Sequence, residues 1–202
     1  RNVALRQSAE QSSTYIDRSL ALDPSLAVDG NTHCSIIDGT TSHTAAEPSP
    51  AWTVTLENSK VVNRFVIYNR ADCCLNRLKN FILTSFDINN NTLWTYQDTT
   101  PEAALIYTFT RLQSDPISRI RIVPTVKESS DTQYVVSLCE VLMYGDCVPG
   151  SWGLECDKTC PVECPASCQP ETGKCFECVG HSDPPLCNTA CSIGQWGLNC
   201  IN

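Results

Sequence analysis

Residues 52–77 of this 202-residue chain read WTVTLENSKVVNRFVIYNRADCCLNR. Apolar and polar side chains alternate in Trp52-Thr53-Val54-Thr55-Leu56, which is the period of a β-strand with one buried face. A second β-rich run follows at residues 61–68. After it, charged side chains surround two adjacent cysteines. The stretch therefore predicts two strands that lead into a loop of unusual chemistry.

Outside this stretch, short β-rich runs separated by Asn, Asp, Gly and Pro continue through the first 146 residues. They cover residues 81–86, 92–96, 105–109, 117–123 and 134–144. No segment keeps a helical apolar stripe for three turns. Residues 1–146 are therefore expected to form an all-β domain, a jelly-roll β-sandwich.

The composition changes at Cys147. The chain has 14 cysteines, and most of them lie in residues 147–202. Two segments, Cys147–Cys156 and Cys191–Cys200, share the pattern Cys-x-x-Gly-x-Trp-Gly-x-x-Cys. An even cysteine number without paired CxxC zinc motifs favours disulfides and an extracellular location. We therefore expect a second domain at residues 147–202, a cysteine-rich tail whose second repeat is truncated.

The charge distribution excludes some partners. The formal net charge is −8 and no basic cluster stands out, which argues against nucleic acid and against anionic membranes. No apolar run is long enough to span a bilayer, so no direct membrane insertion is expected. The N-terminal Arg1-Asn2-Val3-Ala4 lacks an apolar signal core, and we expect a mature end from which a signal peptide was removed.

The pair Cys73-Cys74 permits two interpretations. A bridge between neighbours must close over a Cα separation of about 3.8 Å, below the usual disulfide range, which suggests a functional site. Alternatively, the two cysteines bridge to distant partners. The flanking Arg70 and Arg77 carry planar hydrogen-bond donors, and Asp72 can orient one of them. These residue types together suit a site for a polyol.

Two motifs resemble the F-type lectins, or fucolectins. The first is Arg70-x-Asp72-x-x-x-x-Arg77 with the cysteine pair inside it. The second is Ser42-His43-Thr44, followed by Pro50-Ala51-Trp52 and a strand. The resemblance implies that residues 1–146 form a galactose-binding-like jelly roll that binds fucosylated glycans and is not an enzyme.

The resemblance also implies roles for individual residues. Arg70, Arg77 and His43 would hydrogen-bond L-fucose, and Asp72 would orient an arginine. Cys73 and Cys74 would form a vicinal disulfide against which the sugar packs. Two further residues either line the pocket for the sugar methyl group or serve ordinary loop packing; they are Ile36 and Ile37. A second bridge is implied between Cys34 and Cys139.

A calcium site is implied by two more segments that resemble the family. They are Asp29-Gly30-Asn31 with the residues before it, and Leu138-Cys139-Glu140-Val141. Calcium requires six to eight oxygen ligands, and its role here would be to stabilise long loops. The implied ligands are Leu26, Asp29, Asn31, Thr40, Cys139 and Glu140. The alternative is a simple Asp-Gly-Asn turn, with Glu140 paired to an arginine.

The cysteine-rich tail resembles the EGF-like repeats of multiple-EGF and scavenger-receptor proteins, which serve as spacers and contact surfaces. A single weak sugar site would need an oligomer or a multivalent array for useful avidity. Two other functions remain open. A discoidin-like jelly roll could bind protein or phospholipid on the same scaffold. An enzyme is disfavoured, because the chain has no nucleophile elbow, HExxH motif or supported acidic pair.

Overall fold

The computed structural model describes residues 1–154, 156–165 and 167–202. Two compact units make up the chain: unit 1 covers Arg1–Gly145 and unit 2 covers Asp146–Asn202. The division lies beside Cys147, where the cysteine-rich composition begins.

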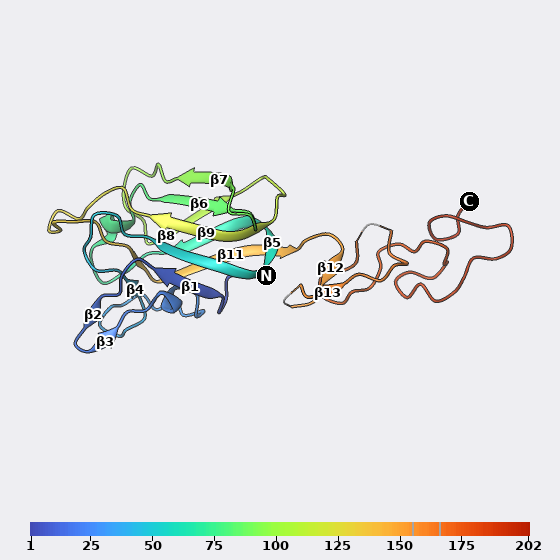
Figure 1. The fold of residues 1–202 in the computed structure, drawn as a ribbon, viewed down its shortest axis with the longest axis horizontal. Helices are drawn as coiled ribbons and strands as arrows, with labels where there is room; N and C mark the ends of the chain where they lie inside the picture. Colours follow the sequence, from blue (N-terminus) through green and yellow to red (C-terminus); the bar gives the residue numbers. More distant parts are fainter. Residues whose placement is uncertain (155, 166) are drawn as a thin grey trace. The chain divides into compact units, whose positions relative to one another are not determined.

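Unit 1 is built on a seven-stranded sheet with the order β1-β5-β9-β6-β7, in which β8 and β11 also pair with β5 (Figure 1). The strands are β1 (Ser8–Gln11), β5 (Trp52–Tyr68), β6 (Ile82–Phe86), β7 (Thr92–Gln97), β8 (Ile106–Thr110), β9 (Ile117–Val123) and β11 (Glu140–Cys147). The prediction of an all-β domain is confirmed.

Short elements flank this sheet. They are β2 (Ile16–Asp17), β3 (Leu20–Ala21), β4 (Ser42–His43), β10 (Ser137–Leu138) and two 3-10 helices, η1 (Pro24–Ala27) and η2 (Leu75–Leu78). β2 pairs with β3, and β4 pairs with β10. Figure 1 shows β2, β3 and β4 at the same end of unit 1 as the coil of η2.

The two strands expected at 52–56 and 61–68 are one continuous strand, β5. Its first half pairs with β1 and β9, and its second half pairs with β8. The register against β9 shifts between Thr55 and Lys60. Such an irregularity bends a strand. The polar residues that suggested a loop are therefore the place where β5 passes from one set of neighbours to the other.

The strand expected at 134–144 is interrupted. Tyr134 forms only an isolated bridge with Glu47, and the regular strands are β10 and β11. Cys139 separates them: its sulfur is bonded to Cys34, and its N–H donates at 3.0 Å to the carbonyl of Tyr68, the last residue of β5. The strand is thus interrupted at the residue that carries a long-range disulfide.

The core of unit 1 combines alternate residues of several strands. Trp52, Phe65, Leu83 and Ile120 are fully buried within it. The indole N–H of Trp52 donates to the carbonyl of Pro24 at 3.0 Å, which satisfies a polar group that would otherwise be buried without a partner. The apolar core therefore stabilises the sheet, and the polar side chains that could bind a ligand lie in the connecting loops.

Unit 2 has two short paired strands, β12 (Ser151–Trp152) and β13 (Lys158–Thr159). Five disulfides hold it: Cys147–Cys156, Cys160–Cys168, Cys164–Cys175, Cys178–Cys187 and Cys191–Cys200. The first and last close the two sequence repeats in the same way. Its buried cluster consists of cysteines, so crosslinks take the place of an apolar core.

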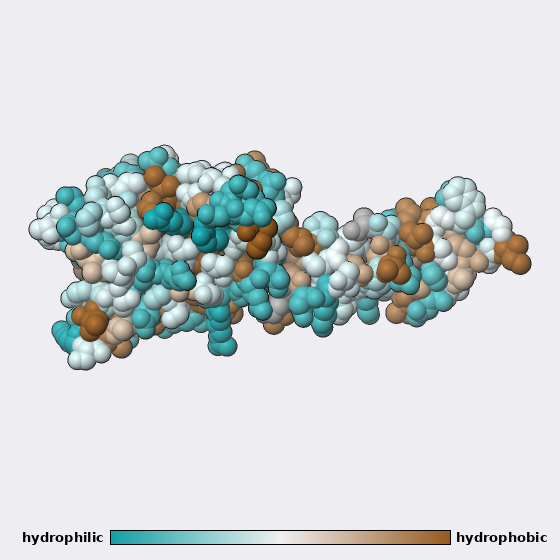
Figure 2. Space-filling view, viewed as in Figure 1, coloured by the Kyte–Doolittle hydropathy of each residue, from teal (hydrophilic) through white to brown (hydrophobic). Residues whose placement is uncertain are grey.

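Among the described residues, no helix has both the length and the apolar character needed to cross a bilayer. Figure 2 shows that the visible face of unit 1 is largely hydrophilic, with apolar side chains scattered over it.

Candidate functional site

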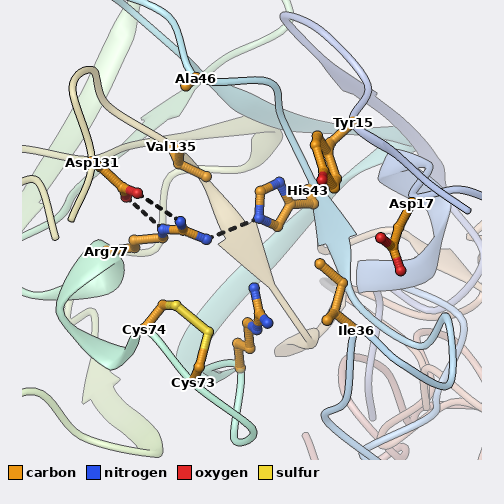
Figure 3. A pocket seen from close by; sticks show the side chains of 11 residues that line it. Tyr15, Asp17, Ile36, His43, Ala46, Cys73, Cys74, Arg77, Asp131 and Val135 are labelled. Carbon is orange, nitrogen blue, oxygen red and sulfur yellow. Dashed lines mark hydrogen bonds and ion pairs between the residues drawn. A yellow bond between two sulfur atoms is a disulfide. The ribbon is translucent and has the colours of Figure 1, made fainter.

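A pocket of about 370 Å³ opens at the end of unit 1 that carries β4 and η2. Its lining includes six residues singled out in the sequence: Ile36, His43, Arg70, Cys73, Cys74 and Arg77. Figure 3 shows the side chains of Ile36, His43, Cys73, Cys74 and Arg77 around the pocket, with His43 on β4 and Arg77 on η2. We call it the Arg70–Arg77 pocket.

Asp72 holds Arg70 in place. The Nε and Nη2 atoms of Arg70 donate to the two carboxylate oxygens of Asp72 at 2.7 and 2.9 Å. The side chain of Arg70 is only 8% exposed, so the pairing offsets the cost of burying its charge. Partial burial raises the pKa of Asp72, but Arg70 outweighs this effect and keeps that pKa below its usual value. Asp72 itself does not line the pocket, in agreement with an orienting role.

Arg77 is held by a carboxylate that the sequence did not suggest. Its Nε and Nη2 atoms donate to Asp131 at 2.7 and 2.8 Å. Hydrogen bonds from Arg77 hold the pKa of Asp131 below its ordinary value. Asp131 lies in a loop between β9 and β10, 54 residues from Arg77, and no local pattern connects the two. Each guanidinium in the pocket therefore has its own bidentate carboxylate.

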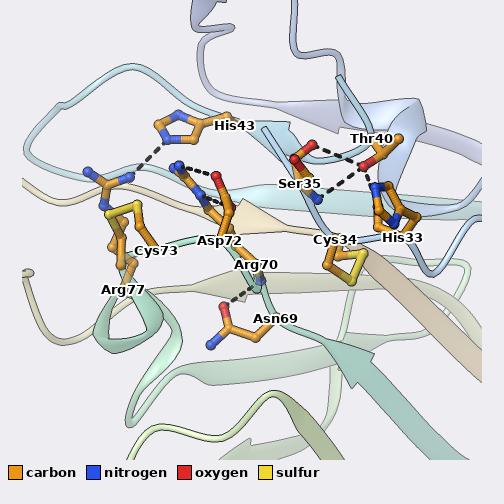
Figure 4. A network of polar contacts seen from close by, with 12 residues as sticks. His33, Cys34, Ser35, Thr40, His43, Asn69, Arg70, Asp72, Cys73 and Arg77 are labelled. Atoms are coloured by element: carbon orange, nitrogen blue, oxygen red, sulfur yellow. Dashed lines mark hydrogen bonds and ion pairs between the residues drawn. A yellow bond between two sulfur atoms is a disulfide. The ribbon is translucent and has the colours of Figure 1, made fainter. Parts of the chain in front are cut away.

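His43 is neutral and presents an acceptor. Burial lowers its pKa to about 4, and the charges of Arg77 and Arg70 act in the same direction. The Nδ1 atom lies 2.6 Å from the carbonyl oxygen of Thr44, which can only accept, so Nδ1 carries the proton. Nε2 then accepts from Nη1 of Arg77 at 3.0 Å (Figure 4). The pocket thus combines two fixed guanidinium donors, and the ring of His43 helps to orient one of them.

Cys73 and Cys74 form a vicinal disulfide, so the expectation from the family resemblance is confirmed and the alternative of distant partners is wrong. Cys34 pairs with Cys139, also as expected. Cys74 has a left-handed backbone with φ 60° at the start of η2. Asn69 secures the turn: its amide nitrogen donates to the carbonyls of Leu75 and Ala104, each at 3.0 Å. The disulfide therefore forms a fixed, sulfur-rich wall.

Other residues of the lining differ from the expectations. Ile36 lines the pocket, whereas Ile37 is 69% exposed and is not part of the lining. The lining also includes five residues that sequence reasoning missed: Tyr15, Asp17, Ala46, Asp131 and Val135. They come from the β2–β3 hairpin and from the loops after β4 and before β10. Their spacing in the sequence carried no signal.

A second polar cluster lies around Glu140, which is completely buried. Its Oε1 accepts the N–H of Gly30 at 3.2 Å, while its Oε2 has no hydrogen-bond partner among the described residues. Burial raises the pKa of Glu140 to about 8, and the nearby charge of Asp29 raises it further. The alternative of an ion pair between Glu140 and an arginine is not present among the described residues. We call this pair the Asp29–Glu140 cluster.

The hydrogen bonds of the other expected calcium ligands do not connect all of them to this cluster. The Asn31 side-chain oxygen accepts from the N–H of His33 at 3.0 Å, and the Thr40 hydroxyl hydrogen-bonds the backbone of His33 and Ser35 (Figure 4). Cys139 is adjacent to Glu140 and buried. Within the described chain, Leu26 and Thr40 make no hydrogen bond with Asp29 or Glu140. A buried carboxylate oxygen without a partner nevertheless fits a hard cation.

Comparisons with known proteins agree with this architecture. Residues 26–122 match the family model of the NedA-like galactose-binding domain. A fucose-binding module of Streptococcus pneumoniae, SpX-3, superposes with a TM-score of 0.61 at 27% identity, over 71% of this chain and 97% of the module. The serum fucolectin of striped bass, Morone saxatilis, gives a TM-score of 0.61 at 26% identity, over 74% of this chain and 50% of that one. The galactose-binding-like jelly-roll prediction is confirmed.

Among curated proteins, Fucolectin-1 of the eel Anguilla japonica is 36% identical over 92 residues, which cover 45% of this chain and 52% of the eel protein. The chain thus spans about half the length of the curated relatives it matches. Residues 26–122 are therefore similar in sequence to the NedA-like galactose-binding domain, and part of the chain is similar to the fucolectins.

Proposed function

We propose that unit 1 is a calcium-stabilised lectin domain that binds glycans with a terminal L-fucose in the Arg70–Arg77 pocket. One observation carries the proposal: Arg70, Arg77 and the Nε2 atom of His43 converge beside the Cys73–Cys74 disulfide. The fucolectins and the pneumococcal fucose-binding module are similar to this chain and support the choice of sugar.

The donor and acceptor pattern suits a sugar. The lone pair of Nε2 of His43 accepts from Nη1 of Arg77, so His43 orients that guanidinium, and the hydroxyl groups of a sugar accept from the remaining N–H groups of Arg70 and Arg77. Because Asp72 and Asp131 already hold both arginines, little side-chain freedom is lost on binding. The disulfide and Ile36 offer an apolar surface to the methyl group and the hydrocarbon face of fucose. The pocket therefore recognises a neutral ligand that is polar on one side and apolar on the other.

The same residues favour binding over hydrolysis. A glycosidase requires a carboxylic acid that is protonated near neutral pH and a second free carboxylate. The pKa values of Asp72 and Asp131 are both lowered, and each carboxylate is occupied by an arginine, which leaves Asp17 as the single unpaired carboxylate among the described lining residues, without a second acid to act with it. We therefore propose that the protein is not an enzyme and that its pocket binds without cleaving.

The test is calorimetric titration of the calcium-loaded protein with free L-fucose, with D-glucose as the control sugar. Saturable heat with fucose and none with glucose is expected. No heat with millimolar fucose would overturn the lectin assignment and favour the discoidin-like alternative, which vesicle and protein binding would then address.

Calcium is proposed as the stabilising ion at the Asp29–Glu140 cluster. The completely buried carboxylate of Glu140, with one oxygen unpartnered among the described residues, supports this. Asp29 and Glu140 would supply carboxylate oxygens, and Asn31 and Cys139 lie beside them in sequence. The ion would compensate the buried charge and tie β11 to the loop after η1.

We further propose that unit 2 consists of EGF-like repeats and that the protein acts outside the cell. The five disulfides of unit 2 support both ideas, since such density persists in oxidising compartments. A lectin with one weak site per chain gains avidity when several copies are presented together, so an oligomer or array of these chains is expected. Sedimentation of the intact protein, with and without a multivalent fucosylated polymer, measures that assembly.

A further inference from the structure

We propose that Asn90 carries an N-linked glycan that shields one edge of the sheet of unit 1. The chain contains a single Asn-x-Ser/Thr sequence, Asn90-Asn91-Thr92, which is the acceptor pattern for this modification in secreted proteins. The proposal rests on the extracellular role proposed above and does not depend on the fucose site.

The acceptor sequence lies in the turn between β6 and β7, and the side chain of Asp87 holds this turn. One carboxylate oxygen of Asp87 accepts the N–H groups of Asn89 and Asn91 at 2.9 and 2.7 Å. The other accepts from the side-chain amide of Asn91 at 2.8 Å, and the N–H of Asp87 donates to the carbonyl of Asn91 at 3.0 Å. Asn90 has a φ of 67°, a conformation that asparagine adopts more readily than most residues. The turn therefore does not depend on the side-chain nitrogen of Asn90.

The side chain of Asn90 leaves its amide nitrogen accessible. Residues 90–92 are all exposed. Nη2 of Arg119 donates to the amide of Asn90, and because a guanidinium only donates, the atom that it contacts is Oδ1. Within the described part of the chain, Nδ2 of Asn90 and the hydroxyl of Thr92 make no hydrogen bond. Both groups that a glycosyltransferase must reach are thus unoccupied.

The modification is a transfer from a polyprenyl-diphosphate-linked oligosaccharide, catalysed by the transferase of the secretory pathway. Nδ2 of Asn90 forms a bond to C1 of the first N-acetylhexosamine, and the bond between C1 and the diphosphate oxygen breaks. The polyprenyl diphosphate leaves with the bonding electrons, and Nδ2 loses one proton to a base of the transferase. No oxidant or reductant is required.

Strand β7 needs protection because it forms one edge of the sheet. Among the described strands it pairs only with β6, and it ends the strand order (Figure 1). Its sequence, Thr-Leu-Trp-Thr-Tyr-Gln, combines β-branched and aromatic residues and contains neither charge nor proline. Uncharged segments of this length and composition pair with other chains when they lie at an exposed edge. The adjoining turn adds Ile88, whose side chain is 78% exposed.

A glycan at Asn90 lies next to this edge. Asn90 precedes Thr92, the first residue of β7, by two positions. N-linked glycans are bulky and keep surfaces in solution, so one at this place hinders the approach of a second chain to β7. Many edge strands carry a lysine or a proline for the same purpose. In this chain the glycan takes that role.

The glycan leaves the Arg70–Arg77 pocket open. Arg77 lies in η2, before β6, whereas Asn90 follows β6. The five residues of β6 separate the two by about 16 Å. Figure 1 shows the turn between β6 and β7 at the end of unit 1 opposite to β4 and the coil of η2. Modification and ligand binding therefore use different ends of the same domain.

The test of the site is mass spectrometry of the full chain secreted from eukaryotic cells, as intact protein and as peptides, before and after digestion with a peptide N-glycosidase. One glycan per chain is expected, on Asn90. Thr92→Ala is expected to lose it completely, whereas Thr92→Ser keeps the acceptor pattern and the glycan. Asn89→Gln, in the same turn but outside the pattern, is the matched control. A parent protein without a glycan on Asn90, or a Thr92→Ala protein that keeps it, overturns the proposal.

The test of the shielding role is light scattering during slow heating of the parent, with its glycan and after enzymatic removal of it. Removal is expected to lower the temperature at which scattering begins. Thr95→Lys places a charge at an exposed position of β7 and is expected to restore that temperature in the protein without glycan. An onset temperature that does not change when the glycan is removed overturns the shielding role, while the glycan site stands.

Discussion

The Arg70–Arg77 pocket and the Asp29–Glu140 cluster differ in whether their buried charges are paired. In the pocket, each arginine is matched by a carboxylate through two hydrogen bonds, and the neighbouring His43 is neutral. In the cluster, Glu140 is completely buried beside a second acid and one of its oxygens lacks a partner in the described chain.

The difference indicates what each region can bind. The two paired arginines of the pocket have no need of a counter-ion, and their remaining donors are directed at a neutral ligand. A buried carboxylate without compensation is costly unless a cation or a proton neutralises it. The pocket is therefore suited to recognition, and the cluster to stabilisation by a metal.

Removal of one arginine should have the largest effect on the pocket. Arg70→Ala deletes a charged donor and leaves Asp72 unpaired, so the affinity for L-fucose is expected to fall at least about 100-fold, or about 2.7 kcal/mol. Titration calorimetry measures the loss. Arg121→Ala, on the exposed face of β9, is the matched control and retains binding. Retained binding in the Arg70→Ala protein, with an unchanged circular dichroism spectrum, contradicts the site.

Removal of the metal should act on stability. Binding of calcium to the folded state at about 100 times its dissociation constant adds about 2.7 kcal/mol, so chelation is expected to lower the Tm by about 5–10 °C. Differential scanning calorimetry in calcium and in EDTA measures the shift. Glu140→Gln keeps the shape of the side chain but loses the charge, and it should abolish the response to calcium. Identical melting curves in calcium and EDTA would remove the metal site.

Acid should disturb the balance of the pocket through His43. Its pKa is lowered to about 4 in the folded protein, so the ring stays neutral at higher pH and becomes charged as the pH falls through that value. Protonation turns the Nε2 acceptor into a donor beside two arginines. Fucose affinity is expected to be constant above about pH 6 and about tenfold weaker at about pH 3. Binding that stays constant to about pH 3, in a protein still folded by circular dichroism, excludes a role in binding for the hydrogen bond from Arg77 to Nε2.

The smallest effect is expected from the carboxylate that orients Arg77. Asp131→Asn keeps the size of the side chain but weakens the two charge-assisted bonds to the guanidinium. Arg77 then gains freedom that binding must remove, and the fucose affinity should drop about fivefold. Asp115→Asn is the control, because the Asp115 side chain is 62% exposed, pairs with the buried Arg111 and does not line the pocket. An equal response of the two variants would show that Asp131 has no orienting role.

Much of the pocket could be predicted because its parts are close together in the chain. Asp72 lies two residues from Arg70, and the two sulfurs of the disulfide belong to neighbours. The strand runs that lead to this loop alternate with a period of two, which is a local property of the backbone. The repeated cysteine motif of unit 2 likewise closes within each copy, at Cys147–Cys156 and Cys191–Cys200.

Strand limits were less predictable where distant partners decide them. The polar residues between Thr55 and Lys60 suggested a loop, but they continue β5 because the strand exchanges its pairing partners there. Residues 134–144 carry a continuous β-rich pattern, and the disulfide from Cys34 to Cys139 interrupts it. Pairing and crosslinks over long sequence distances override local propensity.

The sequence by itself determined the all-β class, the cysteine-rich tail, and the local group of Arg70, Asp72 and the disulfide, since short-range spacing controls each of these. Only the tertiary structure decided which distant side chains complete the site. Asp131 reaches Arg77 from 54 residues away, and the β2–β3 hairpin brings Tyr15 and Asp17 to the opposite end of the pocket. The physical reason is that the packed sheet fixes the ends of the loops and so decides which loops lie side by side. The periodicity of the sequence does not predict which loops become neighbours.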